Sequence, residues 1–220
     1  MMSFASYLSG IRKDSKITQV AMAEILDISV TAIKLIETGT TKFPSDKVLA
    51  NLARFLNVSD LDVIMGILFS EEVNRLHENY LGFRYISYMY LQGYNVDQAP
   101  YIYTVHKKVT RDFDGKLIKK RDNKNVVLVT NYEKYLYRIK EINDDFDAHE
   151  YIADIISLTL SVLDDFRYLH ILFDGNNAEH RRVFDLIKEI RFKKWSFDLY
   201  AVLFDTLEDQ VIEEVLITIK

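Results

Sequence analysis

The stretch of residues 18–39, TQVAMAEILDISVTAIKLIETG, constrains this chain most, because its pattern predicts two short helices joined by a tight turn. In the first helix, apolar side chains recur with the 3.6-residue period of an amphipathic helix. These side chains are Val20, Ala23 and either Met22 or Leu26. We therefore expect this face of the helix to point into a core, with the small Ala23 where the two helices cross.

The second helix is predicted over residues 30–38, after an interruption at Asp27. Ser29 stands where its side-chain oxygen can accept hydrogen bonds from the first amides of this helix. Ile33 and Ile36 direct one face of the helix inward. The residues left on its outer side are Val30, Thr31, Lys34 and Leu35. Two helices arranged in this way form the helix-turn-helix that enters the major groove of DNA.

Further positions around this stretch are in register with one known family. They are Arg12, Gln19, Ala23, Ile28, Ile33, Ile36, Glu37 and Gly39. On the strength of these positions, residues 4–64 resemble the Cro/phage-repressor (XRE-type) helix-turn-helix family. The resemblance implies an all-α domain of five helices in which Arg12 pairs with Glu37. Asp27 and Asn57 replace two glycines of the family pattern, and both residue types tolerate the left-handed backbone that such turns need.

The resemblance also predicts where the later helices begin. Pro44 and Ser45 open a fourth helix. Its inner stripe consists of Leu49, Leu52, Ala53 and Leu56. Residues 57–61, NVSDL, match the family's entry to the fifth helix.

The family's partner is double-stranded DNA, and the match assigns the contacts. The residues implied to read bases are Val30, Thr31, Lys34 and Leu35, and those implied to contact the backbone are Gln19, Thr38, Thr40 and Lys42. Only Thr31 and Lys34 can hydrogen-bond to base edges, whereas the two apolar residues can contact thymine methyl groups. We expect an operator half-site with two contacted thymines and a guanine opposite Lys34.

The charge of this region limits its affinity for DNA. Residues 1–70 hold seven basic and seven acidic side chains, so their net charge is zero. Because phosphate neutralisation supplies most non-specific affinity, a single copy should bind DNA weakly. Either a second basic surface or a homodimer is needed, and XRE-type repressors place two recognition helices one DNA turn apart.

Length and composition favour two small domains, since 220 residues with 49% apolar content can build two cores. We expect a helix-turn-helix domain over residues 1–69, a long amphipathic connecting helix over residues 70–95 and a second domain over residues 96–220. No segment has the length of a signal peptide core or a membrane span, so we expect a cytoplasmic protein with no membrane partner. The chain has no cysteine, which excludes disulfides and thiolate metal sites, and we expect no cofactor and no metal.

Two roles suit the apolar stripe of the connecting helix. It can pack on the second domain as that domain's first helix, or it can join two copies in a dimer. A tyrosine-rich cluster along the same stretch could also line a ligand pocket. The cluster consists of Tyr80, Tyr85, Tyr88, Tyr90 and Tyr94.

The second domain is predicted to be α/β, with a small mixed sheet and a role in dimerisation or sensing. A period-two pattern predicts a strand over residues 101–105, and DFDG at 112–115 predicts a hairpin turn. Leu117 and Ile118 belong to the return strand of this hairpin. Residues 126–129 are predicted to form a short buried strand. Residues 100–140 carry a net charge of +7. Lysines on exposed strands discourage edge pairing, but these side chains could also form an auxiliary basic surface for DNA or meet the acidic tail of a second copy. They are Lys107, Lys108, Lys116, Lys119, Lys120, Arg121 and Lys124.

Two similar apolar strands are predicted further along, over residues 169–174 and 199–205. A helix predicted over 178–194 joins them, so the strands should be parallel neighbours. Asp174 and Asp205 then end at the same edge of the sheet, where they either cap turns or hold a ligand such as Mg²⁺.

A further helix is predicted from Asp147 to about Asp165, and a last strand over residues 213–219. Asp147 with Glu150 three residues later is typical of a capping box. We therefore interpret this carboxylate pair as a helix start and not as a metal site.

The predicted function is that of a sequence-specific transcriptional regulator, a repressor that acts as a homodimer and is not an enzyme, with an effector or protein partner still to be identified. The alternatives are a mobile-element helix-turn-helix protein that binds or inhibits another protein, and a degenerate nuclease-like DNA-binding protein. Restriction-endonuclease-like nucleases need an Asp and a Glu-x-Lys triplet on adjacent strands for their metal. The strand VVLV at 126–129 lacks that triplet, and the chain has no glycine-rich phosphate loop.

Overall fold

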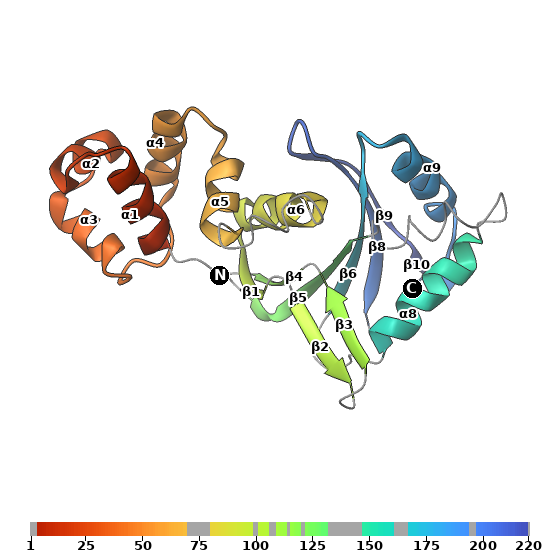
Figure 1. Ribbon diagram of the computed structural model, residues 1–220. Coiled ribbons are helices and arrows are strands. Elements are labelled where there is room, and N and C mark those ends of the chain that lie inside the picture. The colour runs from red at the N-terminus through yellow and green to blue at the C-terminus, as the bar shows by residue number, and fades with distance from the viewer. Residues whose placement is uncertain are drawn as a thin grey trace. The chain divides into compact units, whose positions relative to one another are not determined.

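The computed structural model describes residues 4–69, 80–98, 101–105, 109–113, 115–119, 122–131, 147–160, 167–193 and 197–219. The chain divides into two units, Met1–His77 and Glu78–Lys220 (Figure 1). Both units carry their own core of buried apolar side chains.

Five helices lie in the described part of the first unit, residues 4–69. They are α1 (Phe4–Asp14), α2 (Gln19–Leu26), α3 (Val30–Glu37), α4 (Asp46–Leu56) and α5 (Asp60–Phe69). Helix α1 packs against α3 and α5, α2 packs against α3 and α4, and α4 packs against α5. The side chains of Leu8, Met22, Leu26, Ile33 and Leu52 are fully buried between them. The predicted all-α helix-turn-helix domain is confirmed.

Capping side chains set the helix boundaries in this unit. Ser29 Oγ accepts a hydrogen bond from the Ala32 amide at 3.1 Å and so begins α3. Ser45 serves α4 in the same way. Asp27 and Asn57 end the preceding helices with φ of 52° and 56°. The predicted left-handed turns are therefore present, with Asp and Asn in place of glycine.

The second unit is built on a six-stranded mixed sheet in the order β1-β4-β5-β6-β8-β9. The strands are β1 (Tyr94–Gln98), β4 (Gly115–Lys119), β5 (Asp122–Asn131), β6 (Tyr168–Asp174), β8 (Asp198–Asp205) and β9 (Gln210–Leu216). The three central strands β5, β6 and β8 are parallel, and the pairings toward both edges are antiparallel. Two small pairs of strands are also present among the described residues: β2 (Tyr101–Val105) with β3 (Val109–Phe113), and β7 (Phe192–Lys193) with β10 (Thr218–Ile219).

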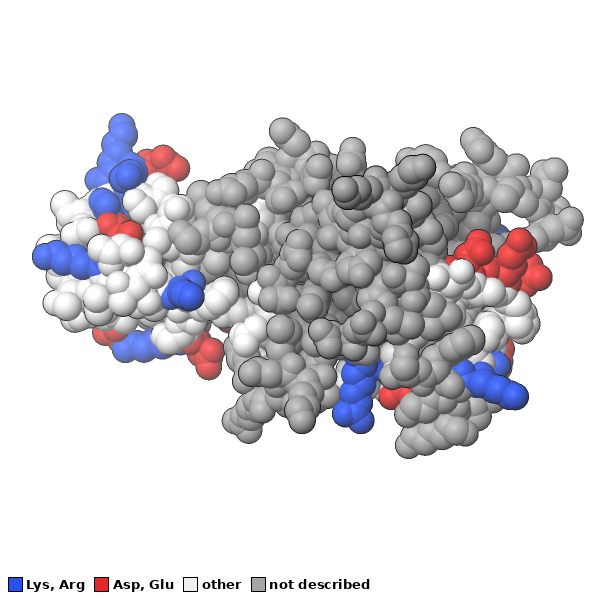
Figure 2. Space-filling view, turned by 90° about the horizontal axis from the view of Figure 1, so that it is seen from below, with Lys and Arg blue, Asp and Glu red and all other residues white. Residues whose placement is uncertain are grey.

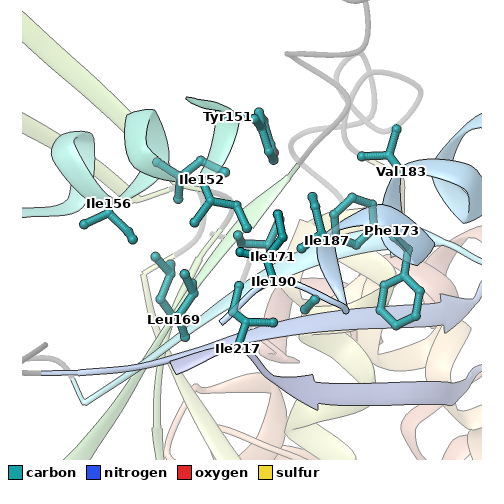
Figure 3. Packing of buried hydrophobic residues seen from close by; sticks show 14 of the residues in the cluster. Tyr151, Ile152, Ile156, Leu169, Ile171, Phe173, Val183, Ile187, Ile190 and Ile217 are labelled. Atoms are coloured by element: carbon teal, nitrogen blue, oxygen red, sulfur yellow. The ribbon is translucent and has the colours of Figure 1, made fainter. Parts of the chain in front are cut away.

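Helices cover both faces of this sheet (Figure 1). Helices α8 (Ala148–Leu160) and α9 (Ala178–Ile187) cover one face, and α6 (Tyr80–Leu91) covers the other. The alternate residues Leu169, Ile171 and Phe173 of β6 join the core under α8 and α9 (Figure 3). His170 on the same strand contacts α6. A strand buried on both faces carries a nearly continuous apolar run, which explains the sequence LHILF.

The crossover from β6 through α9 to β8 is present, and the two strands are parallel neighbours as predicted. Helix α9 is shorter than predicted, however, because it ends at Ile187 and not near residue 194. The apolar spacing continues beyond its end, but Phe192 instead pairs with Thr218 in the short β7–β10 ladder.

The predicted hairpin turn at residues 112–115 is wrong. Residues 109–113 form β3, which pairs antiparallel with β2 from Tyr101↔Phe113 to Val105↔Val109, so Asp112 and Phe113 lie in a strand and not in a hairpin turn. The predicted return strand is β4, and it pairs with β1 and β5. Charged residues within β3 hid this strand in the sequence.

Helix α6 lies within the predicted connecting helix, of which residues 70–79 are outside the described residues. It packs against β1, β4, β5 and β6, and nearly all of its side chains are buried. The apolar stripe of α6 is therefore occupied by the sheet of its own unit. Residues 94–95, predicted as part of the connecting helix, belong to β1.

No helix in the described ranges is long and apolar enough to cross a membrane.

Candidate nucleic-acid interface

Three side chains tie the helix-turn-helix together. Arg12 donates from Nε to Glu37 Oε1 at 2.6 Å and from Nη2 to Oε2 at 3.2 Å, which confirms the pair implied by the family resemblance. Gln19 adds a bond from Nε2 to Glu37 Oε2 at 2.7 Å. The side chains of Arg12 and Glu37 are only 17% and 11% exposed. These bonds join α1, the first residue of α2 and the last residue of α3.

The pKa of Glu37 reflects this arrangement. The hydrogen bond from Arg12 lowers the pKa of Glu37, and the bond from Gln19 lowers it further, against the opposing effect of burial. The carboxylate is therefore held in its charged form. A charged Glu37 in turn fixes the orientation of α3 relative to α1 and α2.

The outer side of α3 is open in the structure. Thr31, Lys34 and Leu35 are exposed, and Val30 is half-buried at the start of the helix. Ile33 and Ile36 are buried on the opposite side. The four side chains that the family resemblance assigns to base reading therefore lie on or beside one accessible face.

Thr38, Thr40 and Lys42 are exposed just after α3. Thr38 Oγ1 donates toward the carbonyl oxygens of Lys34 and Leu35, at 2.9 and 3.2 Å, and lies 3.3 Å from Thr40 Oγ1. Because the Thr38 proton has backbone acceptors within its own helix, Thr40 is the better placed hydroxyl to donate to a phosphate. Gln19 has one amide hydrogen on Glu37 and a second one left for a phosphate.

One apolar residue of the motif was placed wrongly from the sequence. Val20 was predicted to face inward, but its side chain is 53% exposed. Helix α2 buries Met22, Ala23 and Leu26 instead, and at about 100° per residue Val20 points roughly a third of a turn away from them. Val20 therefore adds an apolar side chain to the surface beside Gln19, which sequence periodicity did not reveal.

Basic and acidic side chains are interspersed over the face of the first unit seen in Figure 2. The first unit also has an exposed ion pair, in which Lys47 Nζ lies 2.6 Å from Asp27 Oδ2. Exposed pairs of this kind contribute little to stability. The neutral net charge of residues 1–70 is thus a mixture of signs with no large basic face on this side.

The predicted auxiliary basic surface remains a prediction. Lys107, Lys108, Lys120 and Arg121 lie outside the described residues. The backbones of Lys116, Lys119 and Lys124 belong to β4 and β5. The positions of their side chains are not described.

The acidic residues at the sheet edge form turns. Asp174 Oδ1 accepts from the Asn176 amide and from Thr206 Oγ1, while Asp205 Oδ1 accepts from Asn176 Nδ2 at 2.8 Å. The hydrogen bond from Asn176 also lowers the pKa of Asp205. These contacts favour the turn-capping interpretation over a Mg²⁺ site. Asp147 likewise accepts from the amides of His149 and Glu150 at the start of α8.

Within the described residues, no group of three or more His, Asp or Glu side chains could hold a metal ion.

Comparison with known proteins identifies the first unit. Residues 9–63 match the Helix-turn-helix family in its XRE-type form, which is a family of DNA-binding regulators that typically are not enzymes. The match lies entirely within the first unit. Neither the curated proteins nor the solved structures contain a match to the chain.

Proposed function

We propose that this chain is a sequence-specific transcriptional repressor that binds its operator as a homodimer. The observation that carries the proposal is the accessible face of α3, held in place by the Arg12–Glu37–Gln19 hydrogen bonds. Such a helix can enter the major groove while α2 lies across the DNA backbone.

The side chains on α3 define what can be read. Lys34 offers an ammonium group for guanine acceptors, Thr31 offers a hydroxyl group, and Leu35 offers an apolar contact for a thymine methyl. Leu35 is 44% exposed on the outer face of α3. An apolar contact in the groove gives this exposure a function.

The neutral charge of the first unit supports a dimeric regulator. A single helix-turn-helix domain with no net positive charge gains little binding free energy from counterion release. Two domains bound to one operator must therefore both contribute to the affinity. Two recognition helices separated by about 34 Å meet successive major grooves on one side of DNA. We assign the second unit the role of holding two copies together.

Repression follows from occupancy. A dimer that covers its operator blocks other proteins from that DNA, and this requires no further activity of the chain. The experiment that tests the proposal is binding-site selection with the full chain, followed by a gel shift with the selected sequence and sedimentation of the free protein.

Three variants make the selection diagnostic. Lys34→Ala should cost about 1 to 3 kcal/mol and relax the preference at one base pair, whereas Lys42→Ala should weaken all sequences alike and lower the salt slope by about one unit. Arg54→Ala is the matched control, because it removes an exposed cation from α4, which packs against α2 and α5. It should change neither quantity.

Two results would contradict the proposal. A selection with no enriched motif, or a Lys34→Ala variant with full base preference, would replace direct reading of DNA by the alternative of binding another protein. A full chain that sediments as a monomer would remove the dimer.

A further inference from the structure

A group of aromatic side chains lies on the α6 side of the sheet in the second unit. Ring centroids are 6.1 Å apart for Tyr85 and Tyr88, 5.9 Å for Tyr85 and His170, and 5.4 Å for His170 and Tyr200. Tyr88 also lies 5.4 Å from Phe204. The rings come from α6, β6 and β8, so the fold assembles them from distant parts of the sequence.

Glu214 on β9 belongs to the same face. Its Cα partner across the ladder is Val202, which lies between Tyr200 and Phe204 on β8. Paired residues of antiparallel strands point to the same side, and so do residues two apart on one strand. The Glu214 side chain is therefore a diagonal neighbour of both rings, and it is exposed.

The electrostatics agree with this placement. Burial, and after it the Glu214 charge, raises the pKa of Tyr85 and of Tyr88. The same carboxylate contributes, after burial and other groups, to the raised pKa of Tyr94 and of Tyr200. Burial raises the pKa of Glu214 itself. One side of the carboxylate thus faces phenol rings while the other side faces solvent.

Glu214 has no counter-charge among the described residues, although its neighbours do. Glu213 lies 3.4 Å from Lys188 Nζ, and Asp209 forms a bidentate pair with Arg84. The hydroxyl groups of Tyr88, Tyr94 and Tyr200 likewise make no hydrogen bond within the described part of the chain, whereas Tyr85 bonds to His170 Nδ1 at 2.6 Å. The Glu214 carboxylate and the half-buried phenols of Tyr88 and Tyr200 are thus accessible, and no residue in the described ranges pairs with them.

We propose that Glu214, Tyr88 and Tyr200 form a binding site for a small organic cation with an ammonium or guanidinium group. The faces of aromatic rings are electronegative and attract such cations, and the carboxylate supplies the opposite charge. Tyrosines of this unit already contact guanidinium groups, since Arg84 lies 5.4 Å from the Tyr80 ring centroid and Arg167 lies 5.6 Å from that of Tyr168.

The surrounding charge favours the same ligand. Residues 141–220, which include Tyr200 and Glu214, carry a net charge of −10, whereas residues 100–140 of the same unit carry +7. An anionic ligand would be repelled by Glu214 itself, and a neutral one would leave that carboxylate without a partner. A cation satisfies both conditions.

This site deepens the proposed function, because it gives the repressor an effector of stated chemistry, and it rests on that function only for the role of the ligand. Binding is therefore measured on the full chain without DNA. Tetramethylammonium and arginine methyl ester are titrated against the protein at constant ionic strength, with sodium chloride as the reference salt. The near-ultraviolet circular dichroism of the tyrosines reports binding.

Glu214→Gln is the test variant, and its exposed position makes it compatible with the fold. Glu213→Gln is the matched control, because it removes the neighbouring carboxylate, which pairs with Lys188. We expect saturable binding of at least one organic cation, a loss of affinity of tenfold or more in Glu214→Gln, and no loss in Glu213→Gln. Tyr200→Leu should weaken binding as well, while Tyr200→Phe should retain most of it because the ring face remains.

Equal affinity in Glu214→Gln and the unchanged chain, or equal displacement by sodium, would overturn the proposal. Absent binding together with a dimer that dissociates in Glu214→Gln would overturn the small-molecule assignment and place a Lys or Arg of a second copy at Glu214. A failure of DNA binding alone would leave these titrations unchanged, so the two proposals fail separately.

Discussion

Replacing Glu37 with Ala is the sharpest test of how the helix-turn-helix is held. The change removes three hydrogen bonds to one carboxylate, two from Arg12 and one from Gln19. It also leaves the Arg12 guanidinium without its charge partner, with only the hydrogen bond to the Ile17 carbonyl, in a site where the side chain is 17% exposed. Stranding one member of a fully buried pair costs about 3 to 5 kcal/mol. Because Arg12 retains some access to water, we expect a loss of about 3 kcal/mol.

Hydrogen exchange of the full chain measures this loss unit by unit. Since 1.4 kcal/mol corresponds to a factor of ten, the protected amides of α1 and α3 should exchange about a hundredfold faster in Glu37→Ala. Peptides from β6 and β8 serve as the internal control and should not change. Lys47→Ala is the matched variant, because it breaks the exposed pair with Asp27 in the same unit and should cost no more than about 0.5 kcal/mol.

The same carboxylate predicts a pH dependence. The pKa of Glu37 is lowered from its ordinary 4.5, so the unfolded state binds more protons between the two values. The stability contributed by Glu37 is present above its unfolded pKa and is lost as pH falls through the folded pKa. Glu37→Gln should lack this loss. If α1 and α3 exchange no faster in Glu37→Ala than in Lys47→Ala, the reasoning about the triad is refuted.

Two further predictions concern buried and strained residues. Burial lowers the pKa of His170 from 6.5 to about 4. The free energy of unfolding of the second unit should therefore fall by about 3 kcal/mol as pH falls from 6.5 to 4, with no further loss from His170 below pH 4. Urea unfolding followed by tyrosine circular dichroism should show a shallower pH dependence in His170→Gln, and an unchanged profile would contradict the assignment. Asn57 has φ of 56°, so Asn57→Ala should destabilise α4 by about 1 kcal/mol while Asn57→Gly should not, and equal protection of α4 in both variants would argue against backbone strain there.

The first unit was predictable because its signals are local. Ser29, Asp27 and Asn57 mark helix ends by hydrogen bonds and backbone angles within a few residues of themselves. The Arg12–Glu37 pair is not local, and only the family resemblance supplied it. Val20 was misplaced because periodicity in an eight-residue helix leaves the direction of the buried face uncertain by a large angle.

The sheet was predictable only where burial is symmetric. Strands β6 and β8 are buried on both faces, so their sequences are continuous apolar runs with a helix between them. The position of β4 is instead set by its pairing in the sheet, where it lies between β1 and β5. Local turn chemistry at residues 112–115 favoured a hairpin, and the tertiary pairing of β3 with β2 overrode it.

The tyrosine cluster illustrates the same limit at a candidate site. The sequence grouped five tyrosines along one helical stretch as pocket candidates, but Tyr85 and Tyr90 are buried. The groups that complete the site, Tyr200 and Glu214, lie more than a hundred residues away. Only the β8–β9 register places them on one face. The register of β8 and β9 is fixed by tertiary packing, so no local sequence motif predicts it.

The net charges of the two units limit how strongly the chain can bind DNA. The reading head is neutral, and the segment 141–220 carries −10, so the full chain gains less from phosphate neutralisation than most DNA-binding proteins. In the proposed dimer, discrimination between DNA sequences comes from the base contacts of α3 and from a fixed separation of the two helix-turn-helix domains. A cation held at Glu214 would have two effects on DNA binding. It would remove one negative charge from the second unit, and it would hold α6 in place against β8 and β9. A coupling of about 1 to 3 kcal/mol between such a ligand and DNA is typical of allosteric regulators, and by reciprocity the operator would change the affinity for the cation by the same factor.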